Sequence, residues 1–208
     1  MNILSSQPPA SLTLTALSGI PLLNPGDNLV LIILQSLKQS NLSLKNGDIL
    51  VIAQKVVSKA EGRYARLADI NPSERAFKLA EITGKDPRLV ELILSESREI
   101  VRHSKRTIQS SGVVVAENRQ GIVLANAGID SSNVGSESED EKVLLLPIDP
   151  DKSAGNINKE LQLKFKVRLA VIINDSLGRA WRNGTTGTAL GVSGIPALLN
   201  LRGRPDLF

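Results

Sequence analysis

The sequence contains no cysteine and a single histidine, His103, among its 208 residues. Disulfides, zinc–thiolate sites and thiol nucleophiles are therefore excluded, and so is a metal site built from several histidines. A Ser-His-Asp triad would have to use His103, which lies in the basic run 102–106. A solvated surface histidine is the simpler interpretation of such a run, so we expect no catalytic role for it.

Aromatic residues and long apolar runs are also scarce. Aromatic residues make up 2% of the chain, so a core must come mainly from Leu, Ile, Val and Ala. No apolar run approaches the length that spans a bilayer, and the N-terminus lacks a basic start followed by an apolar signal core. We therefore expect a cytoplasmic protein with no membrane partner.

Charge of either sign is modest, with a formal net charge of +4. Such a charge weakly favours anionic ligands. The basic residues are scattered, and few aromatic rings are present to stack on bases, so we expect no nucleic-acid partner. The apolar fraction of 41% and the charged fraction of 22% are typical of a folded globular protein, either one large domain or two modest lobes.

Two polar runs with nearly the same layout stand out, 126–133 and 174–179. Each follows an apolar run that is typical of a strand, and each presents an aspartate, Asp130 or Asp175, beside hydroxyl, amide and glycine residues. Functional side chains are often found where a chain leaves a sheet edge. Because histidine and cysteine ligands are almost absent, the two aspartates predict oxygen ligands for a hard cation such as Mg²⁺ or Mn²⁺.

Strand-like and helix-like segments alternate along the chain. Helices are predicted through 29–37 with Asp27 as the cap, at Glu74–Thr83 with Ser73 as the cap, at 87–97 and at 151–164. Strands are predicted at 11–17, Ile49–Ala53, 112–116, 121–124, 143–146 and 168–173, the third and fourth forming a hairpin. The acidic run 135–142 is expected to be a mobile, solvated loop.

Basic residues occur in two further runs. Lys55 and Lys59 follow the predicted strand Ile49–Ala53, and their spacing would place both ammonium groups on one side of either a helical turn or an extended segment. A phosphate site and two solvated lysines are about equally compatible with this pattern, and the P-loop spacing is absent. Arg179 and Arg182 flank Trp181; we expect the arginines to bind carboxylate or phosphate and the tryptophan to fill core volume.

These segments resemble those of the coenzyme F420-0:γ-glutamyl ligases, which add L-glutamate to a deazaflavin cofactor precursor. The resemblance runs from about Gly19 to the last residue. It is carried in order by eight groups: 19–22 (Gly-Ile-Pro-Leu), 47–51, 57–62, 71–73, 85–91, 126–133, 144–147 with 149–151, and 175–179 (Asp-Ser-Leu-Gly-Arg).

The resemblance implies an α+β fold that is two-lobed and rich in β-sheet, with flanking helices, assembled as a homodimer. It implies GTP as the energy source, Mg²⁺ or Mn²⁺ as cofactor with a monovalent cation such as K⁺ as an aid, and L-glutamate and a deazaflavin precursor as the other substrates. The implied metal residues are Asp130 and Asp175, with Ser176 near a second ion. The implied GTP-binding residues are Gly19, Ile20, Pro21, Leu22, Gln54, Lys55, Lys59 and Asn133, of which Lys55 is not always basic in relatives.

The implied reaction forms an amide through an acyl phosphate, and metal ions and lysines would offset the charge of the transferred phosphoryl group. No residue of the sequence is identified as a general base. Relatives continue beyond the last residue, Phe208, through a glycine-rich loop that carries a further nucleotide contact and metal ligand. We therefore expect 1–208 to be one ligase-like domain truncated at its C-terminus. The alternative function is a nucleotide- and metal-binding relative without ligase activity.

Overall fold

The structure, a computed structural model, describes residues 11–108, 110–130, 141–178, 181 and 183–204. Its helices are α1 Leu29–Gln39, α2 Gln54–Ala60, α3 Glu74–Thr83, α4 Pro87–Ser95 and α5 Pro150–Phe165, with 3-10 turns η1 Leu67–Asp69 and η2 Asn126–Gly128. Its strands are β1 Ile49–Ala53, β2 Tyr64–Arg66, β3 Ser97–His103, β4 Val114–Asn118, β5 Val123–Ala125, β6 Lys142–Leu144, β7 Ala170–Gly178 and β8 Thr185–Ser193.

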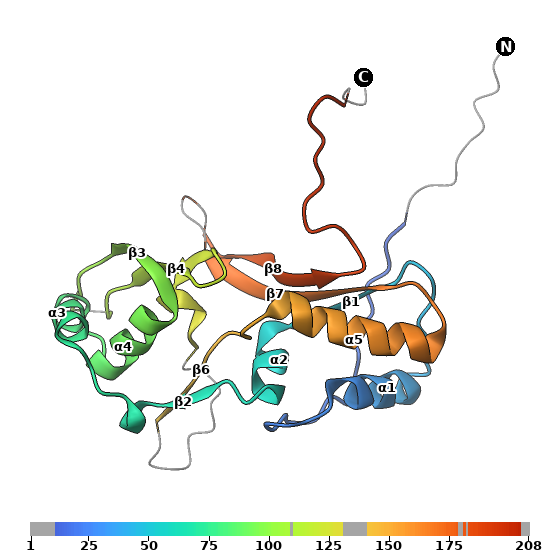
Figure 1. Cartoon of the computed structure of the whole chain (residues 1–208), viewed down its shortest axis with the longest axis horizontal. Helices are drawn as coiled ribbons and strands as arrows, with labels where there is room; N and C mark the ends of the chain where they lie inside the picture. Colours follow the sequence, from blue (N-terminus) through green and yellow to red (C-terminus); the bar gives the residue numbers. More distant parts are fainter. Residues whose placement is uncertain (1–10, 109, 131–140, 179–180, 182, 205–208) are drawn as a thin grey trace.

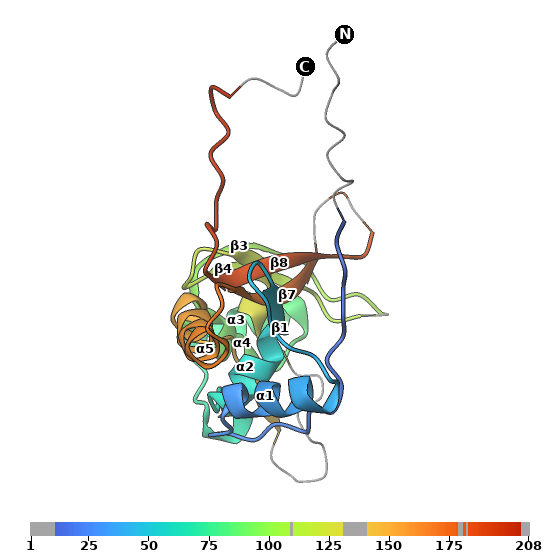
Figure 2. The same cartoon turned by 90° about the vertical axis from the view of Figure 1, so that its right-hand side faces the viewer.

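One lobe, called here the first lobe, is the sheet β1-β7-β8 with α1, α2 and α5. Strand β1 runs parallel to β7 with Ala53 beside Asn174, and β8 runs antiparallel to β7. The three helices lie on the same side of this sheet (Figure 1), and Figure 2 shows α5 and α1 packed below its strands. Their apolar sides form one buried cluster with the sheet: Val30, Ile33, Leu37, Ile52, Val57, Ala154, Ile157, Leu161, Leu169, Val171 and Ile173.

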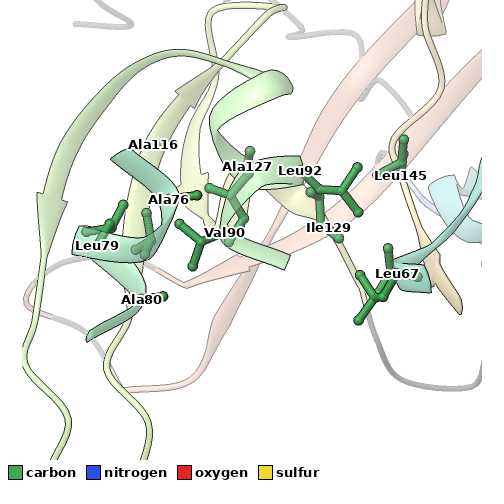
Figure 3. Packing of buried hydrophobic residues seen from close by; sticks show 13 residues of the cluster. Leu67, Ala76, Leu79, Ala80, Val90, Leu92, Ala116, Ala127, Ile129 and Leu145 are labelled. Atoms are coloured by element: carbon green, nitrogen blue, oxygen red, sulfur yellow. The ribbon is translucent and has the colours of Figure 1, made fainter. Parts of the chain in front are cut away.

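The second lobe is the antiparallel sheet β3-β4-β5 with α3 and α4, and it lies beside the first (Figure 1). Its core, shown in Figure 3, packs α3 and α4 against β4, η2 and the segment around β6. A short ladder of β2 with β6 runs between the lobes. A third cluster, of Leu124, Leu146 and Leu190, joins β5 to β8. This two-lobed α+β arrangement confirms the fold class expected from the sequence.

Capping interactions explain where several helices begin. The Ser73 side chain accepts a hydrogen bond from the Ala76 N–H, so α3 begins as predicted, and Gly84 ends it in the left-handed conformation at φ 65°. The cap of α1 is Asn28, whose side chain accepts from the Leu31 N–H. Asp27 was the wrong choice of cap because its carboxylate accepts instead from the Asn24 N–H.

The structure corrects the predicted helices and strands at three places. Residues 11–17 form no strand, and Leu12 and Leu14 are 84% and 87% exposed, because the alternating pattern finds no partner strand among the described residues. The predicted helix 87–97 ends at Ser95, and β3 follows it. The charged residues of β3 obscured a strand whose outer side faces solvent, as is common at sheet edges. Strand β7 extends beyond the predicted end at Ile173 to Gly178, because β8 pairs with its whole polar half.

The other predicted elements agree with the structure to within a few residues. The hairpin of the second lobe is formed by β4 and β5, and α5 covers the predicted helix 151–164. Of the predicted loop 135–142, residues 135–140 lie outside the described residues and Lys142 begins β6. In the part of the chain that the structure describes, no helix combines the length and apolarity needed to cross a membrane.

Candidate functional site

A cleft of about 260 Å³ lies where the two lobes meet. One wall is the turn through η2 and on to Asp130, and the other is the last part of β7 from Asp175 to Gly178. The first residues of α2, Gln54 and Lys55, complete the lining. In full, the lining consists of Gln54, Lys55, Leu124, Ala125, Asn126, Gly128, Ile129, Asp130, Asp175, Ser176, Leu177 and Gly178.

The wall that carries Asp130 has an irregular backbone. Asn126, Ala127 and Gly128 follow one another with φ of 52°, 53° and 81°. A side chain at Gly128 would meet the Leu146 Cδ1 atom at 2.5 Å, so glycine is required there both by conformation and by close packing. Beyond the turn, the Asp130 N–H donates to the Leu144 carbonyl at 2.9 Å and the Leu144 N–H donates back at 2.8 Å. This bridge to β6 fixes the backbone of Asp130 at the cleft.

The wall that carries Asp175 is part of the strand β7, whose pairing with β8 shifts register just before it, between Ile173 and Asn174. Asp175 pairs with Thr188 of β8, and its Oδ1 atom accepts a hydrogen bond from the Ser176 N–H at 2.8 Å. Adjacent residues of a strand point to opposite sides of the sheet. Asp175 and Ser176 can nevertheless both line the cleft, because the cleft lies at the end of the first lobe. The expectation that Asp175 follows the strand was wrong, since it lies within β7.

Lys55, Asp130 and Asp175 form a cluster of charged side chains in the cleft. Lys55 makes an ion pair with the Oδ2 atom of Asp130. Burial raises the pKa of the Asp175 carboxyl above its ordinary value, while the Ser176 N–H and the charge of Lys55 lower that pKa and the charge of Asp130 raises it. Two carboxylates thus share one ammonium group, which leaves the cleft favourable for a further cation.

The donor atoms of the cleft suit a hard divalent cation. Carboxylate oxygens come from Asp130 and Asp175, a hydroxyl comes from Ser176, and an amide comes from Asn126. The Oδ1 atom of Asn126 is buried and accepts no hydrogen bond from any described residue. Within the described ranges, no three Asp, Glu, His or Cys side chains are grouped as a metal cluster. An ion here would therefore need the hydroxyl, the amide, water or a ligand's oxygens besides the two carboxylates.

Five of the predicted site residues come together in this cleft: Gln54, Lys55, Asp130, Asp175 and Ser176. Gln54 is buried, and its Oε1 atom accepts from the Ser58 hydroxyl. Lys59 does not line the cleft and lies in the last turn of α2. The Gly19-Ile20-Pro21-Leu22 segment is exposed and also lies outside the lining, with Gly19 next to the Gln39 side chain.

The remaining predictions fall in two groups. Asn133, Arg179 and Arg182 lie outside the described residues. Trp181 was predicted to fill core volume, which is wrong because it is 101% exposed. Its backbone has φ of 65°, typical of a turn rather than of a packed strand. Asn126 was recognised only as part of a run, and its place two residues before Gly128 was the available signal of a turn at the site.

The fold and the cleft define a class, a two-lobed α+β protein with an oxygen-lined, acidic cleft at the junction of its lobes. Comparison with known proteins gives the family. The family model F420-0:gamma-glutamyl ligase matches residues 19–208. The chain therefore belongs to the F420-0:γ-glutamyl ligase family.

Individual relatives agree with this family. The chain is 44% identical over 197 residues to the coenzyme F420:L-glutamate ligase of Methanothermobacter thermautotrophicus, covering 95% of this chain and 74% of that protein. It is 44% identical to the protein of that name from Methanopyrus kandleri, covering 88% of this chain and 67% of the relative. The Archaeoglobus fulgidus protein of that name is 38% identical, with 91% and 70% covered. The chain thus spans about two-thirds to three-quarters of the length of these relatives.

Proposed function

We propose that this protein is a GTP-dependent ligase that joins L-glutamate to coenzyme F420-0 through an amide bond. Membership of the ligase family and the names of its relatives support the reaction class. The observation that carries the proposal is the convergence of Asp130 and Asp175, from distant parts of the sequence, on one cleft with Lys55. Such a cleft can hold a cation and the phosphates that the cation binds.

In this proposal Asp130 and Asp175 hold Mg²⁺ or Mn²⁺, and Ser176 lies near a second ion. When bound, the metal ion offsets the negative charge that develops on the phosphoryl group during transfer. Lys55 has its ammonium group at the same cleft and is placed to add a positive charge. Gln54 and Lys55 would contact GTP at the cleft. Lys59 and the segment Gly19-Ile20-Pro21-Leu22, which lie outside the cleft lining, complete the proposed GTP contacts together with Asn133, which is not among the described residues.

The chemistry follows from the low reactivity of a carboxylate. Transfer of the γ-phosphoryl group of GTP to a carboxylate of the acceptor forms an acyl phosphate and releases GDP. The amine of L-glutamate then attacks the acyl carbon, phosphate leaves, and an amide remains. We assign no general base to the amine. A K⁺ requirement, a homodimer and a cytoplasmic location stay predictions from the family resemblance.

The direct test is mass spectrometry of coenzyme F420-0 incubated with the 208-residue chain, GTP, Mn²⁺ and L-glutamate. We expect a product heavier by one or more glutamyl units, with release of GDP and phosphate. Asp130→Asn and Asp175→Asn should each lower turnover by at least roughly 100-fold, because loss of an outer-shell partner of a metal ligand alone costs up to about that much. Asp69→Asn is a matched control, because Asp69 pairs with Arg66 away from the cleft.

The outcomes separate two functions. Full turnover in both cleft variants would contradict the metal assignment. A folded chain that binds GTP with Mn²⁺ yet forms no product, with each substrate supplied, would instead support a nucleotide- and metal-binding relative without ligase activity.

Lys59→Ala should weaken binding of GTP more than binding of glutamate, and the opposite result would move Lys59 to the amino-acid site.

A further inference from the structure

Asn126 is the feature of the cleft that the proposed function leaves unexplained. Its side-chain oxygen, Oδ1, is buried and receives no hydrogen bond from the described residues. Buried polar atoms in folded proteins nearly always have a partner, and an exception calls for a specific cause such as a bound ion or a ligand. Asn126 lines the same cleft as the two aspartates, so a ligand bound there can supply the partner.

Other asparagines of this protein show what a structural role looks like. The Oδ1 atom of Asn118 accepts hydrogen bonds from the Gln120 N–H at 3.0 Å and the Ile122 N–H at 2.9 Å. The Oδ1 atom of Asn46 accepts from the Arg168 N–H at 2.7 Å. These side chains hold turns or strands together, whereas the oxygen of Asn126 makes no comparable bond among the described residues. A structural role therefore does not account for this oxygen.

The chemistry of the neighbours decides what the partner is. A carbonyl oxygen binds either a hydrogen-bond donor or a cation. Among the described lining residues, the charged groups are the carboxylates of Asp130 and Asp175 and the ammonium group of Lys55, which pairs with Asp130. The carboxylates attract cations, and an amide oxygen adds a further neutral ligand of the type that hard divalent ions accept.

We propose that Asn126 Oδ1 is a third oxygen ligand of the divalent cation held by Asp130 and Asp175. This inference rests on the proposed function, because it assumes that the two aspartates bind that ion. The turn at φ of 52° places Asn126 in a conformation that asparagine and glycine adopt more readily than most residues. The same turn leads through Gly128 to Asp130, so one short segment supplies two of the three ligands.

The test is binding of Mn²⁺ alone, followed by electron paramagnetic resonance and calorimetry without nucleotide. Asn126→Gly removes the amide and keeps the backbone conformation, and we expect affinity for Mn²⁺ to fall on the order of tenfold or more. Asn126→Asp restores an oxygen at the same position with an added negative charge, so its affinity should equal or exceed that of the unaltered protein. Asn46→Gly is the matched control and should bind Mn²⁺ unchanged.

Each outcome has a defined consequence. If Asn126→Gly binds Mn²⁺ as tightly as the unaltered protein while Asp130→Asn does not, the inference about Asn126 fails and the proposed metal site stands. If Asp130→Asn and Asp175→Asn also bind unchanged, or if the unaltered chain binds no Mn²⁺ at millimolar concentration, the metal site and the inference fail together. Thermal unfolding without metal identifies a variant that has simply lost its fold, and Asn126→Asp then provides the deciding comparison.

Discussion

The two walls of the cleft carry the same functional group on different kinds of backbone. Asp130 follows a turn of three successive residues with positive φ and is held by an isolated bridge to Leu144. Asp175 lies within β7, where each residue around it is paired with β8. The backbone position of Asp130 therefore depends on a few specific residues, whereas that of Asp175 depends on a β-ladder formed by many residues.

The two aspartates also differ in their electrostatic surroundings. Asp130 has Lys55 as a direct ion-pair partner. For Asp175 the main influence is burial, which raises the pKa of its carboxyl. The charges of Lys55 and Asp130 have smaller effects on that pKa. Replacing Asp130 or Asp175 by asparagine should consequently change the free energy of unfolding in opposite directions when no metal is present. The predictions below test this contrast, beginning with the largest expected effect.

Gly128→Ala should lower the free energy of unfolding by about 3 kcal/mol. Residue 128 has a positive φ, and the added methyl carbon would lie 2.5 Å from the Leu146 Cδ1 atom. Urea unfolding measures the change. Gly178→Ala is the matched control on the strand wall, where φ is not positive and no atom of the described residues lies within 4 Å of the added carbon, so we expect a change within about 0.5 kcal/mol. Equal losses in both variants would contradict the contrast between the walls.

Asp130→Asn should destabilise the metal-free protein by about 1 kcal/mol through loss of the ion pair with Lys55. The pair lies partly in solvent, which keeps the expected effect small. A double-mutant cycle with Lys55→Met isolates the interaction between the two side chains. A coupling free energy indistinguishable from zero would show that this pair does not stabilise the folded state.

Asp175→Asn should stabilise the metal-free protein at pH 7. The folded-state pKa of Asp175 is raised, so its contribution is fully present below the ordinary value of 3.8 and is lost as pH rises through the folded pKa. Asparagine mimics the neutral acid, and its advantage in thermal unfolding with chelator present should shrink as pH falls towards 4. A lower unfolding temperature for this variant at pH 7, or an advantage that does not change with pH, would contradict the assignment.

Local signals predicted α1, α3, α4, α5 and β1 to within a few residues, whereas the segment that forms α2 was left open between a helix and an extended stretch. Ser73 and Gly84 mark the two ends of α3 because capping depends on nearby residues alone. The apolar run of β1 was enough to predict a strand, but the expectation that the strand is buried was wrong: Ile52 is buried, whereas Ile49 and Val51 are 51% and 59% exposed because the helices cover one side of the sheet. The aspartates of the cleft were also found, because the residue types that bind a hard cation are few and both occur in matching runs.

The errors arose where structure depends on distant partners. The polar half of β7 became a strand because β8 pairs with it, and the glycine- and threonine-rich β8 carries little strand signal of its own. Residues 11–17 have the alternating pattern and no partner. The role of Asn126 could not be predicted from the sequence, because an unsatisfied oxygen is recognised only when its surroundings are known.

The parallel pairing of β1 with β7 sets the spacing of the charges in the cleft. Since Ala53 lies beside Asn174, the residues that follow, Gln54 and Lys55 on one strand end and Asp175 on the other, are delivered side by side. Sliding β1 by two residues would keep its buried side inward and yet displace Lys55 along β7 by about 7 Å. The register of these two strands thus sets where the ammonium group of Lys55 lies relative to Asp175, and a change of register would move that charge without replacing any residue that lines the cleft.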